Sequence, residues 1–128
     1  MQENNLEIIN LTKGALPRVP FVDLKEEILG TDYELSVSFV ELAQMKKISN
    51  EYKGDPTHLN VLSFPLEKKS GEIIMNLDSV KKEAKNFGHS FEKHLVFLVI
   101  HGMLHLAGHR HGSKMESEEK RLLASHGF

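Results

Sequence analysis

Four of the eight histidines of this 128-residue chain lie within residues 101–111, and three of them have a spacing that could bind a metal ion. His101 and His105 are four residues apart, so on a helix both side chains project from one face, one turn apart. Gly108 then follows, and glycine readily adopts the left-handed conformation that ends a helix. The chain could therefore turn and bring His111 to the other two imidazoles, leaving an open position on the metal for water or substrate.

The ligand type predicts one zinc ion held by His101, His105 and His111, although nickel and copper also suit imidazole ligands. Three neutral ligands leave the double charge of the ion uncompensated. A bound water would then have its pKa lowered towards about 7, and a carbonyl or phosphoryl oxygen would be polarised. The predicted chemistry is hydrolysis.

The other histidines are weaker candidates. His109 is an alternative third ligand, but it would point elsewhere if the helix ends near Ala107. His94 lies seven residues before His101 on the same helical face, so it could support the site or face a substrate. The remaining ones are interpreted as ordinary surface or core residues: His58, His89 and His126.

A protease is one alternative, because metzincin proteases share the spacing H-x3-H-x5-H. Those enzymes need a glutamate directly after the first histidine as general base, and this chain has Gly102 there. A metal-dependent hydrolase of peptides is therefore disfavoured.

Nine elements are expected to position these residues. Branched residues and apolar–polar alternation predict strands at Leu6–Thr12, Glu34–Val40, Val61–Pro65 and Glu72–Leu77. Apolar residues at helical spacing predict helices at about 21–29, 42–52, 79–87, 91–107 and 113–125. We expect an α+β fold: a single domain over residues 1–128, with about four strands in a mixed sheet and helices packed on it.

Helix 91–107, which carries His101 and His105, is apolar nearly all round and is therefore expected to be buried. Ser90 is expected to cap it, either Asp78 or Ser79 the preceding helix, and a capping box at 113–116 the last one. A proline at position 65 predicts a strand end or an edge strand.

Composition limits which other classes of protein and of binding site are possible. The chain has no cysteine, which excludes disulfides, disulfide-linked partners and thiolate ligands. A net charge of −2 argues against a broadly basic nucleic-acid binder but permits a local basic groove. No stretch is long and apolar enough to span a membrane, and residues 1–5 lack the pattern of a secretory signal, so a cytoplasmic location is expected.

The metal-site stretch, H-G-M-L-H-L-A-G-H-R-H at 101–111, resembles the signature H-G-x-L-H-L-x-G-Y-D-H of the YbeY-type endoribonucleases. Two further blocks are similar in the same order: V-L-S-F-P at 61–65 and G-E-I-I at 71–74. The resemblance implies a metal-dependent endoribonuclease acting on single-stranded RNA, in maturation of the small-subunit rRNA 3′ end and in ribosome quality control. Its implied partners are rRNA and the small ribosomal subunit, and its implied metal, usually zinc, would be held by His101, His105 and His111.

Several positions depart from the family pattern. His109-Arg110 replaces Tyr-Asp, Asn60 replaces an aspartate, and Lys53 replaces an arginine proposed to contact substrate. Lysine keeps the charge of arginine but loses its bidentate fork. Lys53 and Arg110 are the candidate catalytic or phosphate-binding residues, while lysines 46 and 47 could extend a basic surface or be ordinary solvated side chains.

The departures leave a third interpretation open, a non-catalytic, ribosome-associated RNA-binding module with a structural metal. An open coordination position argues against it, because structural zinc sites are normally closed by four protein ligands.

Overall fold

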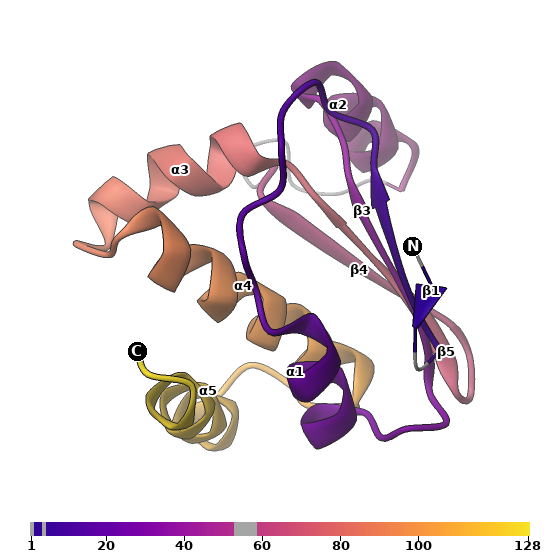
Figure 1. Cartoon of the computed structure of the whole chain (residues 1–128), viewed down its shortest axis with the longest axis vertical. Coiled ribbons are helices and arrows are strands. Elements are labelled where there is room, and N and C mark those ends of the chain that lie inside the picture. The colour runs from indigo at the N-terminus through magenta and orange to yellow at the C-terminus, as the bar shows by residue number, and fades with distance from the viewer. Residues whose placement is uncertain (1, 4, 53–58) are drawn as a thin grey trace.

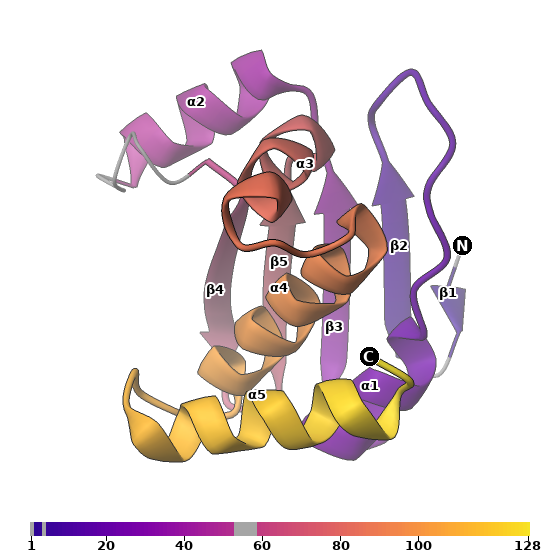
Figure 2. The same cartoon turned by 90° about the vertical axis from the view of Figure 1, so that its left-hand side faces the viewer.

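The computed structural model describes residues 2, 3, 5–52 and 59–128, and in these residues five helices pack on one mixed sheet (Figures 1 and 2). The strands are β1 (Gln2–Glu3), β2 (Leu6–Asn10), β3 (Glu34–Phe39), β4 (Val61–Glu67) and β5 (Ser70–Met75). The helices are α1 (Phe21–Ile28), α2 (Leu42–Glu51), α3 (Leu77–Asn86), α4 (Phe91–Leu106) and α5 (Ser113–Ser125). The predicted α+β class and mixed sheet are confirmed.

The strand order is β1-β2-β3-β5-β4. Strand β3 pairs in parallel with β2 and β5, whereas β1 and β4 are antiparallel to their neighbours. The four predicted strands are β2 to β5, and the two-residue β1 is the strand that the sequence did not predict. Pro65 lies in the edge strand β4 beside a register shift, as expected for a residue that cannot donate to a ladder.

The two faces of the sheet differ in what covers them. Alternate residues of β3, namely Leu35, Val37 and Phe39, point into the main core beneath α1, α3, α4 and α5. Ile74 points to the opposite face and packs with Met45 of α2 in a smaller cluster. Helix α4 lies across the main face in Figure 2, with α3 and α5 beside it.

Helix α4 is held very close to the sheet. The predicted cap is confirmed, since the Ser90 hydroxyl accepts a hydrogen bond from the Lys93 backbone N–H. Nine of its sixteen residues are buried. A Cβ atom on Gly102 would lie 2.9 Å from Oγ of Ser63 in β4 and 3.2 Å from Cδ1 of Ile73 in β5. A larger residue at position 102 would therefore force Ser63 or Ile73 to shift.

The end of α4 turns the chain back, as predicted. Gly108 has φ of +98°, in the left-handed region that favours glycine. Its N–H donates to the carbonyl of His105, and the N–H of His109 donates to that of Leu104, which are the two bonds of a Schellman motif.

Two predicted helix caps were wrong, although α5 begins at Ser113 as predicted. Asn76 caps α3, because its side-chain oxygen accepts a hydrogen bond from the Ser79 backbone N–H. The strand expected to run through Leu77 ends at Met75, and α3 begins at Leu77. The capping box at Ser113 does not form, because Ser113 is already the first helical residue and the N-cap position is taken by Gly112, which has φ of +155° and no side chain to accept a hydrogen bond.

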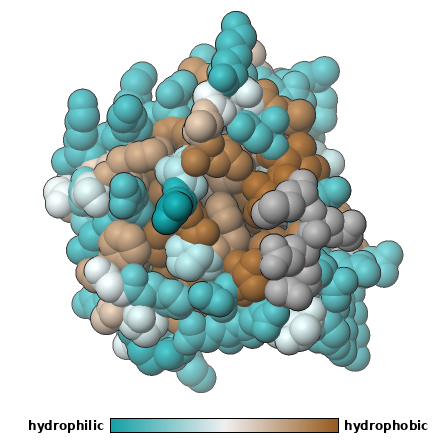
Figure 3. Space-filling model, viewed as in Figure 1, coloured by the Kyte–Doolittle hydropathy of each residue, from teal (hydrophilic) through white to brown (hydrophobic). Residues whose placement is uncertain are grey.

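Residues 11–20, between β2 and α1, have no regular secondary structure but cover the main core. Leu16 and Val19 pack against its buried residues. On the face drawn in Figure 3, hydrophobic side chains gather near the middle, where this segment crosses, and hydrophilic ones surround them. Among the described helices, none combines the length and apolar character of a membrane span.

We expect Gly102→Ala to lower the free energy of unfolding by about 1–3 kcal/mol, because the added methyl group overlaps Ser63 and Ile73. At an unobstructed helical position the same change would raise stability by roughly 0.5–1 kcal/mol. Urea unfolding followed by circular dichroism measures whether the free energy of unfolding falls or rises. Gly14→Ala is the control, since a Cβ there meets nothing within 4 Å. Unchanged or higher stability of Gly102→Ala would contradict the close packing.

Candidate metal centre

The structure brings His101, His105 and His111 together. One nitrogen from each lies within 4.8 Å of the others, forming a group that could bind a metal ion. Ring centroids of His101 and His105 are 4.5 Å apart, and those of His105 and His111 are also 4.5 Å apart. His101 and His105 lie one turn apart on α4, and the Schellman turn at Gly108 brings His111 back beside them.

Hydrogen bonds fix which nitrogen of each helical histidine faces the centre. Nδ1 of His101 lies 2.6 Å from Oε2 of Glu119, and Nδ1 of His105 lies 3.2 Å from the carbonyl oxygen of His109. Both partners are acceptors, so each Nδ1 carries the hydrogen and donates it. The Nε2 atom of each ring is then left with a lone pair.

The Nε2 lone pairs of His101 and His105 face each other. Nε2 of His101 and Nε2 of His105 are 3.1 Å apart. Two acceptors cannot hydrogen-bond to each other, so a cation between them would satisfy both. Nitrogens bound tetrahedrally to one zinc at about 2.0–2.1 Å lie about 3.3 Å apart, so this spacing fits such an ion.

Electrostatics also favour neutral ligands. Desolvation by burial lowers the pKa of His105, and the nearby His101 adds to this effect. The side chain of His101 is 23% exposed, so the expectation that the whole helix is buried was wrong for this stripe. His101 and His105 are half-buried because they line a cavity, while their helical neighbours fill the core.

Glu119 is a residue that sequence reasoning missed. It lies on the buried face of α5 between Met115 and Leu122, with only 8% of its side chain exposed. A carboxylate at an apolar helical position was the available signal, because a buried charge needs a partner. Its bond to His101 matches the carboxylate–histidine pairs that orient metal ligands.

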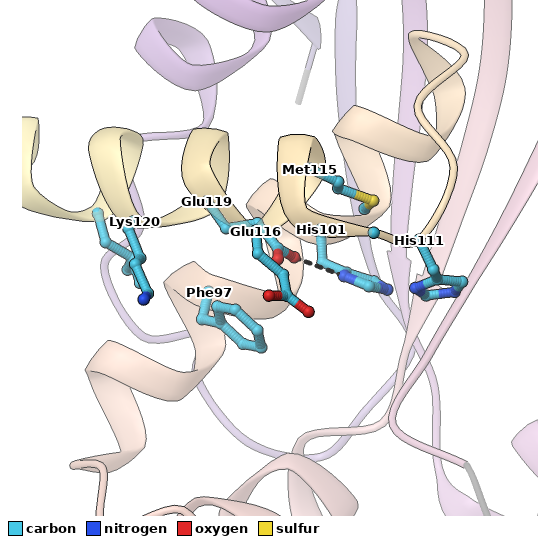
Figure 4. Close-up of a pocket in the computed structure, with 9 residues that line it drawn as sticks. Phe97, His101, His111, Met115, Glu116, Glu119 and Lys120 are labelled. Carbon is cyan, nitrogen blue, oxygen red and sulfur yellow. Dashed lines mark hydrogen bonds and ion pairs between the residues drawn. The ribbon is translucent and has the colours of Figure 1, made fainter.

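Two cavities adjoin the histidines. The smaller, of about 350 Å³, opens between α4 and α5, and Figure 4 shows Phe97, His101 and His111 around it with the residues of α5. In that view the Glu116 carboxylate points into the space between Phe97 and His101, and Lys120 lies at the far end from His111.

The larger cavity, of about 680 Å³, is a cleft between α4, α3 and the edge strand β4. All three clustered histidines line it, together with Phe97 of α4 and Ser63 of β4. His101 and His111 line both cavities, whereas His105 lines only the larger one, so a substrate in the cleft could reach all three imidazoles.

The other predicted residues are placed as follows. His109 is outside the group, and its carbonyl accepts from His105. Arg110 is exposed and is not among the residues that line either cavity. Lys53 and His58 lie outside the described residues. His94 is fully buried and bonds to Glu83, not to the three histidines.

The comparisons with known proteins agree on one family. A family model described as endoribonuclease YbeY matches residues 3–126. A protein of that name from Caldanaerobacter subterraneus subsp. tengcongensis is 36% identical over 118 residues, covering 78% of this chain and 72% of its own. One from Alkaliphilus metalliredigens is 32% identical over 131 aligned positions, covering 94% of this chain and 84% of its own.

A solved structure is similar as well. The solution structure of a protein from Thermotoga maritima superposes with a TM-score of 0.63 at 29% identity, covering 92% of this chain and 86% of that protein. The similarity therefore extends over nearly the whole fold.

We expect Glu119→Gln to weaken zinc binding by about 10–100-fold, because a neutral amide orients and polarises His101 less well. Competition with a chromophoric chelator measures the affinity, and circular dichroism checks the fold. Glu118→Gln is the matched control, since Glu118 pairs with Arg121 on the exposed side of the same helix. Equal zinc affinity in both variants would exclude an orienting role for Glu119.

Proposed function

The chain belongs to the YbeY endoribonuclease family, and we propose that it is a metal-dependent endoribonuclease that cuts single-stranded RNA. The observation that carries the proposal is the pair of Nε2 lone pairs, 3.1 Å apart, facing each other at the wall of an open cleft. We extend the proposal to maturation of the small-subunit rRNA 3′ end and ribosome quality control in the cytoplasm, as the family resemblance implies.

We assign the metal to His101, His105 and His111, with zinc as the ion that this ligand type favours. When bound, such an ion lowers the pKa of a coordinated water and polarises a phosphoryl oxygen. The protein's own part is to keep the imidazoles neutral and oriented, which Glu119 and the His109 carbonyl do through the two Nδ1 atoms.

Glu116 is our candidate for the proton acceptor. Three carboxylates line the two cavities: Glu83, Glu116 and Glu119. Glu119 is bonded to His101, and Glu83 accepts from His94 and Asn60. The Glu116 carboxylate makes no hydrogen bond with another described residue, and it points into the smaller cavity beside His101 (Figure 4).

The proposed reaction is hydrolysis of a phosphodiester. A bond forms between a water oxygen and phosphorus, one phosphorus–oxygen ester bond breaks, and the water proton passes to Glu116. The departing ribose oxygen takes a proton from solvent. Lys120 is an exposed cation on the same cavity and can contact a phosphate oxygen.

The peptide alternative is weakened by the packing at Gly102. A metzincin places its catalytic glutamate at this position. In this protein a Cβ there would meet Oγ of Ser63 at 2.9 Å and Cδ1 of Ile73 at 3.2 Å, and Gly102 is not among the residues that line either cavity. A structural metal in a non-catalytic RNA-binding module is weakened by the open cleft, since such sites are normally closed.

We expect His105→Ala and Glu116→Gln to separate metal binding from proton transfer. His105→Ala removes a ligand and should lose both bound zinc and cleavage of single-stranded RNA. Glu116→Gln should keep zinc but cut RNA about 10²–10⁴-fold more slowly, the usual contribution of a general base. Metal analysis and a gel assay on labelled RNA, with casein as a protease control, measure these outcomes. Zinc-loaded wild type that cuts no RNA under any metal supplement would refute the proposal.

We expect Arg110→Glu to weaken RNA binding by a few-fold and to reduce the dependence of the dissociation constant on salt, because a side chain next to His111 would lose one phosphate contact. Zinc content should not change. Arg121→Glu on α5 is a control of the same charge change at an exposed position. If RNA affinity, salt dependence and cleavage all match the wild type, Arg110 has no part in substrate binding.

A further inference from the structure

A second polar group lies in the large cleft, apart from the three histidines. Oε2 of Glu83 accepts two hydrogen bonds, one from Nδ2 of Asn60 at 2.5 Å and one from Nε2 of His94 at 2.7 Å. Nδ1 of His94 in turn lies 3.1 Å from Nδ1 of His89. Glu83 and Asn60 line the cleft, while His94 is fully buried behind them.

The Glu83 carboxylate can only accept, and this sets the directions of the hydrogen bonds for neutral imidazoles. His94 donates from Nε2 to the carboxylate, so a neutral His94 accepts at Nδ1 from His89. Burial lowers the pKa of His89, with Lys93 and His94 adding to the effect, which favours a neutral His89. The chain therefore holds the carboxylate of Glu83 in one orientation.

That orientation leaves one acceptor unused. Both donors bind Oε2, and no described residue donates to Oε1 of Glu83. The side chain is 24% exposed. A carboxylate that is fixed by two donors on one oxygen can offer the other oxygen to a ligand in the cleft.

An exposed aromatic ring lies beside this acceptor. Phe87 lines the same cleft and is 56% exposed. Its ring centroid is 5.0 Å from that of His94, at an interplanar angle of 32°, and 5.9 Å from that of His89. A single exposed phenylalanine is ordinary. Beside a fixed hydrogen-bond acceptor, however, it forms the combination with which proteins stack and read an unpaired base.

The position relative to the metal ligands suits a polymer. His94 precedes His101 by seven residues of α4, which corresponds to about 10 Å along the helix axis. Phe97 lies between them, with its ring centroid 5.7 Å from that of His94 and 6.1 Å from that of His101. A strand bound at the histidines would therefore place a nearby nucleotide, not the cleaved bond, at Glu83.

We propose that Phe87 and Glu83 form a base-binding subsite for an unpaired base that carries an exocyclic amino group. The inference rests on the proposed function, because it takes single-stranded RNA as the ligand. Cytosine can donate from its N4 amino group to Oε1, whereas uracil presents the O4 oxygen at the corresponding position and is repelled. Cytosine and uracil are alike in size and stacking surface, so they give the clean comparison.

The test is binding of short, labelled oligocytidylate and oligouridylate to the purified protein, by fluorescence anisotropy, with strand integrity checked on a gel. Wild type should bind oligocytidylate about fivefold more tightly, the value of one hydrogen bond. In Glu83→Gln the amide oxygen keeps the bonds from His94 and Asn60, so the amide NH₂ faces the cleft and the preference should reverse towards oligouridylate. Phe87→Ala should weaken binding of both strands by about fivefold or more, without changing their ratio.

Glu92→Gln is the matched control, because it removes the same charge from an exposed position in the first turn of α4 and should keep the wild-type preference. Equal binding of the two strands by wild type, or an unchanged preference in Glu83→Gln, would overturn the subsite. RNA cleavage without any base preference would overturn the subsite alone. A preference that Glu83→Gln reverses, in a protein that cuts no RNA with any metal, would support the subsite and refute the proposed function.

Discussion

The contact between α4 and the sheet at Gly102 is the constraint on which the candidate site depends. At this residue the helix approaches β4 and β5 so closely that an added Cβ would meet Ser63 at 2.9 Å and Ile73 at 3.2 Å. One face of α4 is thereby pressed into the core, and the neighbouring stripe that carries Phe97, His101 and His105 faces the cleft. Burial of the first face stabilises the position of the second, because close-packed interiors allow little movement.

The orientation of the histidines is then set by groups from three parts of the chain. The helix itself supplies His101 and His105, the Schellman turn at Gly108 supplies the His109 carbonyl and returns His111, and α5 supplies Glu119. Each acceptor takes an Nδ1 hydrogen, so both helical Nε2 lone pairs are directed at one point. Such preorganisation lowers the cost of assembling a metal site.

Local patterns explain what the sequence could predict. Spacing within a single helix and turn identified His101, His105 and His111, and alternation identified four strands, because both depend on neighbours in the chain. Spacing within one helix does not reveal Glu119 and Glu83. Their partners, His101 and His94, are 18 and 11 residues away on another helix. At Gly102 the sequence indicates only that the catalytic glutamate of a metzincin protease is absent. The close contact with Ser63 and Ile73 depends on strands that are distant in the sequence.

The three carboxylates that line the two cavities differ in their hydrogen-bonding partners, and this difference suits them to different roles. Glu119 is bonded to a metal-ligand candidate and is nearly buried, so it suits orientation. Glu83 is fixed by two donors on one oxygen, so it suits recognition of a ligand donor. Glu116 is exposed and bonded to no other described residue, so both oxygens of its carboxylate are open to a proton. The same residue type thus serves three purposes because the fold gives each copy a different set of neighbours.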